Sequence, residues 1–388
     1  MMSGCWPWNR DSARSERGFT LIELMVALVV SSLLVGMILA IFNRMSIAYR
    51  GQQQIAGVQQ VLAAARATIE IDAKQAGLGL SQGFRYASDG AAPNPRKPVA
   101  VIDSSTGPDQ LFFYYADPTT QAAVTGGSLL TATVNVDATT GFAVGDLVVL
   151  SKVDTTTSGI NGGDANIATY ESCVLRIATI TAAGPPRFTF ETALPWGRTN
   201  EDHCTVAPAT GMMLYKFIAR AYRIDTSTPA RAALGPLQQS PKFGGLTGTA
   251  ADDWTDLAFG FTDIQTALQI YDKTSAPSDS ADLDTDPDRE WYSGAMQTTL
   301  TAQTTVLPAG DGFLQMSISL VARTDREVEG ITTAATPTLM DATLPDNNTL
   351  GNRASVALPS AVDPALKGSK IYRYTTFVVD LRNLGVGR

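Results

Sequence analysis

The chain has little charge. Only 17% of its 388 residues are Asp, Glu, Lys or Arg, whereas an average globular domain has about 25%. The charge is also unbalanced, since 37 acidic residues outnumber 29 basic ones and give a formal net charge of -8. Binding to phosphate groups along a nucleic acid needs a cationic surface. This balance therefore argues against a nucleic-acid partner. The low charge does not predict disorder, because 44% of the residues are hydrophobic.

Histidine is nearly absent, which excludes several classes of catalytic site. The one histidine, His203, is followed by Cys204, but a Cys-His pair needs side chains that converge in space, and adjacency in sequence does not provide this. The sequence also lacks zinc-ligand spacing, a P-loop, a Gly-rich dinucleotide turn and a GxSxG elbow. We therefore predict that the protein is not an enzyme.

Cysteine is also scarce. Cys5 lies in an N-terminal segment that we expect to be removed, so Cys173 and Cys204 remain in the mature chain. In an oxidising compartment they can form one disulfide, which closes a loop of roughly 30 residues and stabilises the fold by about 3–4 kcal/mol. The alternative is two buried free thiols, because spacing in sequence does not give the Cα distance that a disulfide requires.

One acidic run could hold a metal. Carboxylates alternate along residues 279–290, with Asp282, Asp284, Asp286 and Asp288 at its centre. Oxygen ligands in this pattern suit Ca²⁺, but an EF-hand counted from Asp282 would need glycine and glutamate where Pro287 and Ser293 stand. The alternatives are a looser calcium site and a solvated acidic loop. Calcium is the only cofactor that the sequence suggests.

The chain has one long hydrophobic run. Residues 1–18 are polar, and residues 19–42 read FTLIELMVALVVSSLLVGMILAIF. A helix of about 24 residues spans roughly 36 Å, enough to cross a membrane core of about 30 Å. Arg10, Arg14 and Arg17 precede the run, so the positive-inside tendency keeps the short N-terminal side in the cytoplasm. Arg44 and Arg50 on the far side weaken that signal.

Glu23 is the single charge within this run. A carboxylate near the centre of a membrane helix costs about 2.5–3.5 kcal/mol on insertion scales, and somewhat less near an interface. Such a residue indicates a function and calls for a partner. If the chain were cut before Phe19, the new α-amino group would supply that partner, either in the same helix or from a neighbouring parallel helix. In the second case the charge pair would fix the axial stagger between helices, as one polar residue fixes register in a coiled coil.

The residues around this point carry a family resemblance. The segment RGFTLIELMVAL, residues 17–28, resembles the cleavage and methylation motif of type IV prepilins. The resemblance implies that prepilin peptidase cuts after Gly18 and methylates Phe19 as the new N-terminus. It also implies that Glu23 is needed for assembly. Unlike many major pilins, the run contains no proline, so local melting of the helix in a filament is an open question.

The hydrophobic run continues into an amphipathic helix. Ile55, Val58, Leu62, Ala65, Ile69 and Ala73 recur at spacings of three and four, which predicts one apolar face over residues 43–79. Glu70 and Lys74 form a favourable i,i+4 pair. Gly77 and Gly79 are expected to end the helix, giving a total length of about 55–60 residues.

Short apolar runs separated by Gly, Pro, Asn, Asp and Thr follow, and they predict strands. The candidate strands are 110–115, 131–136, 146–152, 173–181, 187–191, 212–224, 257–265, 267–271, 313–323 and 370–382. A helix followed by many strands predicts an α+β fold, with the long helix packed on an antiparallel sheet in residues 80–388. The segment 125–210 could be an inserted β-subdomain. We expect a leader at 1–18 and a membrane helix at 19–42.

The wider chain is most similar to the PilW-type minor pilins. The similar pieces are Asp72 with Ala76-Gly77, Asp263-Ile264-Gln265 with Tyr271, the strand SLVAR at 319–323, and Arg382-Asn383. This resemblance implies a minor pilin that primes or supports assembly of a type IV pilus. The expected partners are prepilin peptidase, other minor and major pilins, the inner-membrane assembly machinery and the membrane itself.

Two other functions fit the same anchor. One is a minor pseudopilin of a type II secretion system, and the other is an adhesin displayed at a pilus tip. In each case we expect a single-pass precursor in the bacterial inner membrane with its globular region in the periplasm. A pilus subunit would later become extracellular.

Overall fold

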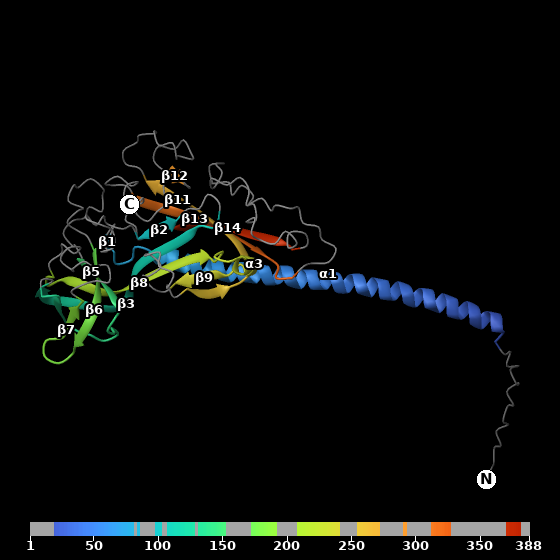
Figure 1. Ribbon diagram of the computed structural model, residues 1–388, viewed down its shortest axis with the longest axis horizontal. Helices are drawn as coiled ribbons and strands as arrows, with labels where there is room; N and C mark the ends of the chain where they lie inside the picture. The colour runs from blue at the N-terminus through green and yellow to red at the C-terminus, as the bar shows by residue number, and fades with distance from the viewer. Residues whose placement is uncertain are drawn as a thin grey trace, which may run out of the picture. The chain divides into compact units, whose positions relative to one another are not determined.

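A computed structural model describes the chain in eleven segments. They are residues 19–80, 84–85, 98–102, 107–128, 131–152, 172–191, 208–240, 254–271, 290–292, 312–326 and 370–381. The chain divides into two compact units, Met1–Gln53 and Gln54–Arg388. The helix α1 (Leu21–Gln75) contributes to both units, and the second unit contains all the described strands (Figure 1).

Helix α1 is largely exposed in the first unit and partly buried in the second. Every residue from 19 to 45 is exposed, although nearly all are apolar. From Val58 onward, the residues of the predicted stripe are buried, and Ile69 and Ala73 are completely covered. The predicted ion pair is present, with Lys74 Nζ 2.6 Å from Glu70 Oε1. The helix ends at Gln75, and the turn after it uses left-handed backbone at Gly77 and Gly79, as predicted.

The larger sheet has ten strands, and one short helix lies in the connection between two of them. Its strands are β1 (Phe84–Arg85), β2 (Val99–Ile102), β3 (Gln110–Ser128), β4 (Thr133–Val136), β5 (Leu147–Lys152), β6 (Ser172–Thr181), β7 (Arg187–Phe190), β8 (Met212–Ile224), β9 (Leu237–Ser240) and β10 (Thr255–Ala258). Helix α3 (Pro229–Leu234) connects β8 to β9. The strand order is β10-β9-β8-β5-β6-β7-β4-β3-β2, and all pairs are antiparallel except β1 with β6.

The smaller sheet has four antiparallel strands in the order β12-β11-β13-β14. They are β11 (Phe261–Tyr271), β12 (Glu290–Tyr292), β13 (Gly312–Arg323) and β14 (Tyr372–Asp380). A long helix followed by antiparallel sheets confirms the α+β fold class.

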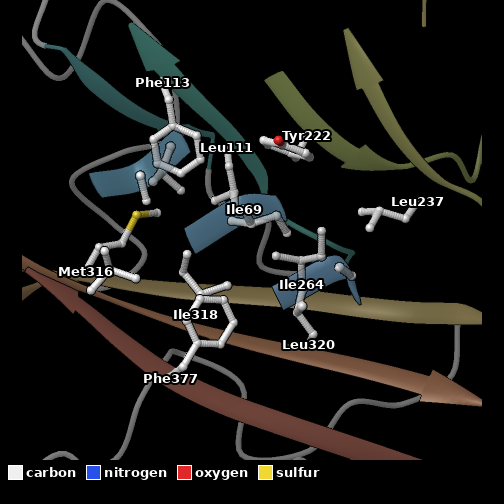
Figure 2. Close-up of a cluster of buried hydrophobic side chains, with 14 of the residues drawn as sticks. Ile69, Leu111, Phe113, Tyr222, Leu237, Ile264, Met316, Ile318, Leu320 and Phe377 are labelled. Carbon is white, nitrogen blue, oxygen red and sulfur yellow. The ribbon is translucent and has the colours of Figure 1, made fainter. Parts of the chain in front are cut away.

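The second half of α1 lies between the two sheets. Figure 2 shows Ile69 on the helix, with Leu111 and Tyr222 of the larger sheet on one side and Ile318 and Phe377 of the smaller sheet on the other. All five side chains belong to one buried cluster. Because this cluster takes residues from three layers, the helix forms the centre of the core.

Part of the larger sheet closes into a ring. Strand β8 pairs with β5 and also with β3, so the path β3-β4-β7-β6-β5-β8 returns to its start. The ring encloses its own apolar cluster, which contains Val124, Val134, Leu150, Leu175, Phe188 and Leu214 among others. The ring overlaps the segment 125–210, and whether that segment is an inserted subdomain stays a prediction.

An irregularity in β3 marks the beginning of the ring. The register with β8 shifts between Asp117 and Gln121, and Pro118 lies in the shift. Proline inside a sheet is tolerated at such bulges, because it cannot donate to a ladder. Asp117 Oδ1 accepts hydrogen bonds from the backbone N–H and the hydroxyl of Thr119. The corner thus satisfies its own polar groups.

Two predicted strand boundaries were wrong. The sequence predicted strands at 257–265 and 267–271, but β11 runs unbroken from Phe261 to Tyr271 and the break lies at Gly260. Gly260 has a φ of 92°, which interrupts the strand, whereas Thr266 continues the pairing with Ile318. The predicted strand at 110–115 was also too short, since β3 continues to Ser128 beyond the bulge.

Candidate assembly site

The first turn of α1 forms a capping box from Thr20 and Glu23. Thr20 precedes the helix, and its hydroxyl accepts a hydrogen bond from the Glu23 backbone N–H at 3.3 Å. In return, Glu23 Oε2 accepts hydrogen bonds from the Thr20 backbone N–H at 3.0 Å and from the Thr20 hydroxyl at 2.9 Å. Such reciprocal bonds satisfy donors at a helix start that have no partner within the helix.

The capping box uses only one carboxylate oxygen of Glu23. Among the described residues, Oε1 has no hydrogen-bond partner. Both Thr20 and Glu23 are exposed. Glu23 therefore keeps a fixed orientation through Oε2 while Oε1 remains available to a donor from outside the chain. The negative charge also lies at the positive end of the helix dipole, which favours it there.

The helix that follows the capping box has the properties of a membrane segment. By length and composition, α1 is able to cross a membrane. Ser31 and Ser32 are the polar residues at its middle, and their hydroxyls donate back to the carbonyl oxygens of Ala27 and Val29 at 2.6 and 2.8 Å. Their polar groups are thus satisfied within the helix and suit an apolar surrounding.

Comparison with known proteins bears on this segment. The family description "Prokaryotic N-terminal methylation motif" matches residues 13–39. The N-terminus is type IV pilin-like. The match includes Gly18, Phe19, Thr20 and Glu23, and it points to a structural protein that is processed by prepilin peptidase and assembles with other pilins. No curated protein and no solved structure matches the chain.

The remaining predicted site residues lie largely outside the described residues. This applies to Gly18 on the leader side of the cut, to Cys204, and to the acidic run with Asp282, Asp284, Asp286 and Asp288. The backbone of Cys173 lies in β6, opposite Leu150. In the part of the chain that the structure describes, no group of three or more His, Cys, Asp or Glu residues could hold a metal ion. The disulfide and the calcium site stay predictions.

A second polar group joins α1 to the larger sheet. We call Asp72, Tyr115, Tyr222 and Gln239 the helix-anchor cluster. The Asp72 carboxylate, 7% exposed, accepts hydrogen bonds from the hydroxyl of Tyr115 at 2.8 Å and from the hydroxyl of Tyr222. Gln239 Nε2 donates to the Tyr222 oxygen at 2.7 Å. Burial, followed by the nearby Asp72 charge, raises the pKa of both tyrosines above the usual range.

The helix-anchor cluster fixes how the larger sheet packs on the second half of α1. Its members come from α1, β3, β8 and β9, and all the hydrogen bonds converge on one turn of the helix. The same end of the helix is held by backbone bonds, from Gly77 N–H to Tyr114 O at 2.9 Å and from Ala116 N–H to Leu78 O at 2.7 Å. A polar group this specific sets one orientation of the sheet on the helix, where apolar contacts alone would permit several.

Sequence reasoning missed both polar arrangements. The capping box has a recognisable signature, Ser or Thr followed three residues later by Glu, and Thr20 and Glu23 fit it. The helix-anchor cluster has no such signature, because its other members are 43 to 167 residues from Asp72 in the chain. Only the register of β3, β8 and β9 brings them together.

Proposed function

We propose that this protein is a minor pilin of a type IV pilus, cut after Gly18, methylated at Phe19 and incorporated through α1. The observation that carries the proposal is the match of residues 13–39 to the methylation motif, at the start of a helix with an exposed apolar surface. A helix with so many exposed apolar residues needs a membrane or other helices around it. The membrane would surround this helix in the precursor, and the helices of other subunits would surround it in the core of a pilus.

The capping box suggests how Glu23 acts in assembly. Cleavage after Gly18 would create a positively charged amine at Phe19, and Glu23 Oε1 can accept a hydrogen bond from such an amine. Because Thr20 holds Oε2, the carboxylate would meet the amine of a neighbouring subunit in one orientation. In an apolar environment such a pair is strong when formed and costly when only one partner is present. It would therefore select the axial stagger at which both charges meet.

The experiment separates the charge of Glu23 from its capping role. Glu23→Gln keeps a capping-box acceptor but removes the charge, whereas Thr20→Ala weakens the cap and keeps the charge. If the charge sets the stagger, Glu23→Gln and Glu23→Ala will both be cleaved and inserted in the membrane yet be lost from sheared filaments. Immunoblots of the membrane and filament fractions measure this. Normal incorporation of Glu23→Gln would contradict the charge argument.

The localisation belongs to the same proposal. The precursor would be a single-pass protein of the bacterial inner membrane, with the unit from Gln54 onward in the periplasm. Its partners would be prepilin peptidase, other pilins and the assembly machinery of that membrane. Protease added to spheroplasts should then digest the unit from Gln54 onward, and resistance to it would reverse the proposed orientation.

Two alternatives share the same N-terminal evidence. A minor pseudopilin would assemble by the same helix, and a tip adhesin would add a receptor-binding role to it. Neighbouring genes distinguish a pseudopilin from a pilus subunit. Secretion-system genes would favour a pseudopilin, whereas other minor pilin genes would favour a pilus subunit. The PilW-type resemblance favours the pilus.

A further inference from the structure

The strand β14 forms a long open edge of the smaller sheet. On one side it pairs with β13 without any register shift, from Tyr372 opposite Arg323 to Asp380 opposite Gln315. On the other side, within the described part of the chain, no strand is its neighbour. Residues 373–379 make no backbone hydrogen bond beyond β13. Among the described residues, a row of backbone donors and acceptors is therefore left unpaired along this edge.

This edge lacks the usual protection against pairing. Residues 374–379 read Tyr-Thr-Thr-Phe-Val-Val and contain no charge, proline or glycine. The other terminal strands are protected. Strand β10 has four residues, a register shift and the charge of Asp256, while β2 has four residues and β12 three. Short, bulged or charged edges resist pairing, whereas a long uncharged edge of β-favouring residues promotes it.

The side chains of β14 also present an apolar surface. Phe377 and Val379 point into the core, so the alternate residues Tyr374, Thr376 and Val378 lie on the opposite face. Tyr374 is 50% exposed and Val378 is 44% exposed. An added strand that carried apolar residues on this face would cover both, since aromatic and β-branched side chains pair well across strands.

We propose that β14 accepts an extended strand from a different anchored subunit of the filament, an inference that rests on the proposed function. An extended chain is the one partner that satisfies a row of edge hydrogen bonds. A second copy pairing through its own β14 would need a two-fold axis perpendicular to the sheet, which reverses every direction in that plane. Because α1 packs on this sheet through Ile69 and Ile318, the two helices would then run in opposite directions. Two subunits anchored from the same side of one membrane cannot do so.

Photocrosslinking tests the partner directly. The full chain carries p-benzoylphenylalanine in place of Tyr374, in cells that assemble the filament, and Val144 is the matched control position. Val144 is also exposed, but it lies in the connection between β4 and β5 of the larger sheet, whereas β14 belongs to the smaller sheet. The expected product joins residue 374 to a strand of another subunit that has its own methylated N-terminus, and mass spectrometry identifies the joined peptides. A product with a second copy of this chain, or no product that depends on position 374, would overturn the proposal.

A substitution provides the second arm. Val378→Lys places a charge on the open edge, and it should reduce incorporation into filaments by about tenfold. Val144→Lys should leave incorporation unchanged. Thermal unfolding of both full-length variants in detergent shows that each folds. If Glu23→Ala is excluded from filaments while Val378→Lys is incorporated normally, the proposed function stands and the strand addition fails.

Discussion

At the residue scale, the Asp72 carboxylate joins α1 to the larger sheet through hydrogen bonds to side chains of three strands. It is buried beneath two tyrosine hydroxyls, and Gln239 completes the group. A buried carboxylate that loses a donor keeps its desolvation cost. Tyr222→Phe should therefore lower the free energy of unfolding by about 1–3 kcal/mol, although it removes only one oxygen. Tyr374→Phe is the matched control, because that side chain is half exposed on β14. Urea unfolding of the full chain in detergent measures both, and equal losses would show that the bond to Asp72 is not important.

The same cluster predicts an alkaline limit to stability. The pKa of Tyr115 and that of Tyr222 are raised in the folded chain by burial and by Asp72. A phenol whose folded pKa lies above its unfolded value, about 10, gives stability that is fully present below pH 10. That stability is lost as pH rises above the unfolded pKa. The free energy of unfolding should thus fall as the pH rises above about 10, and the fall should be smaller in Tyr222→Phe. An identical pH profile for both chains would contradict this origin.

At the element scale, α3 shows how a short helix can be fixed at both ends. Thr228 caps its start by accepting from the Arg231 backbone N–H at 3.2 Å, and Gly235 ends it in the left-handed conformation with φ 59°. Arg231 joins the helix to Asp225 at 2.8 Å and to Asp256 of β10 at 2.6 Å. The helix therefore holds the β8–β9 connection against β10 and the start of β11.

Gly235 allows this close approach. A Cβ atom there would lie 2.0 Å from the Phe261 carbonyl oxygen, which belongs to the backbone and cannot move aside. Gly235→Ala should reduce the free energy of unfolding by more than about 2 kcal/mol, from the clash and the positive φ together. Gly57→Ala is the matched control, since it lies in α1 with nothing within 4 Å of a Cβ atom. That change should be neutral or stabilising by up to about 1 kcal/mol. Circular dichroism during thermal unfolding compares the two, and similar melting temperatures would contradict the prediction.

At the scale of the whole globular unit, both sheets depend on one helix. Ile69 is fully buried and shares its cluster with Leu111 of the larger sheet and Ile318 of the smaller one (Figure 2). Ile69→Ala should cost about 2–5 kcal/mol. It should also lower the stability of both sheets together, because each sheet contacts the Ile69 side chain that the substitution removes. Hydrogen exchange of β3 and of β13 should accelerate by the same factor. Acceleration in one sheet alone would show that the sheets unfold separately.

The sequence predicted the parts of the molecule that depend on local patterns. The end of α1 follows from Gly77 and Gly79, and its buried face follows from the spacing of apolar residues such as Val58 and Ile69. The closed ring and the helix-anchor cluster were not predictable, because both depend on which strands become neighbours. Strand β3 shows the difference, since its first half has a clear apolar pattern and its second half begins after a proline bulge. Pairing with β8 keeps that second half in the sheet.

The open edge of β14 also bears on the time a free subunit can survive. The uncharged edge at residues 374–379, with exposed Tyr374 and Val378, can pair with any extended chain, including a misfolded one. If the proposed strand addition occurs, a subunit in the membrane would be prone to aggregate or to be degraded until the edge is occupied. Cells would then need to match the supply of this chain to that of the partner strand. A surplus of this chain over its partner would accumulate as proteolytic fragments instead of as a stable pool.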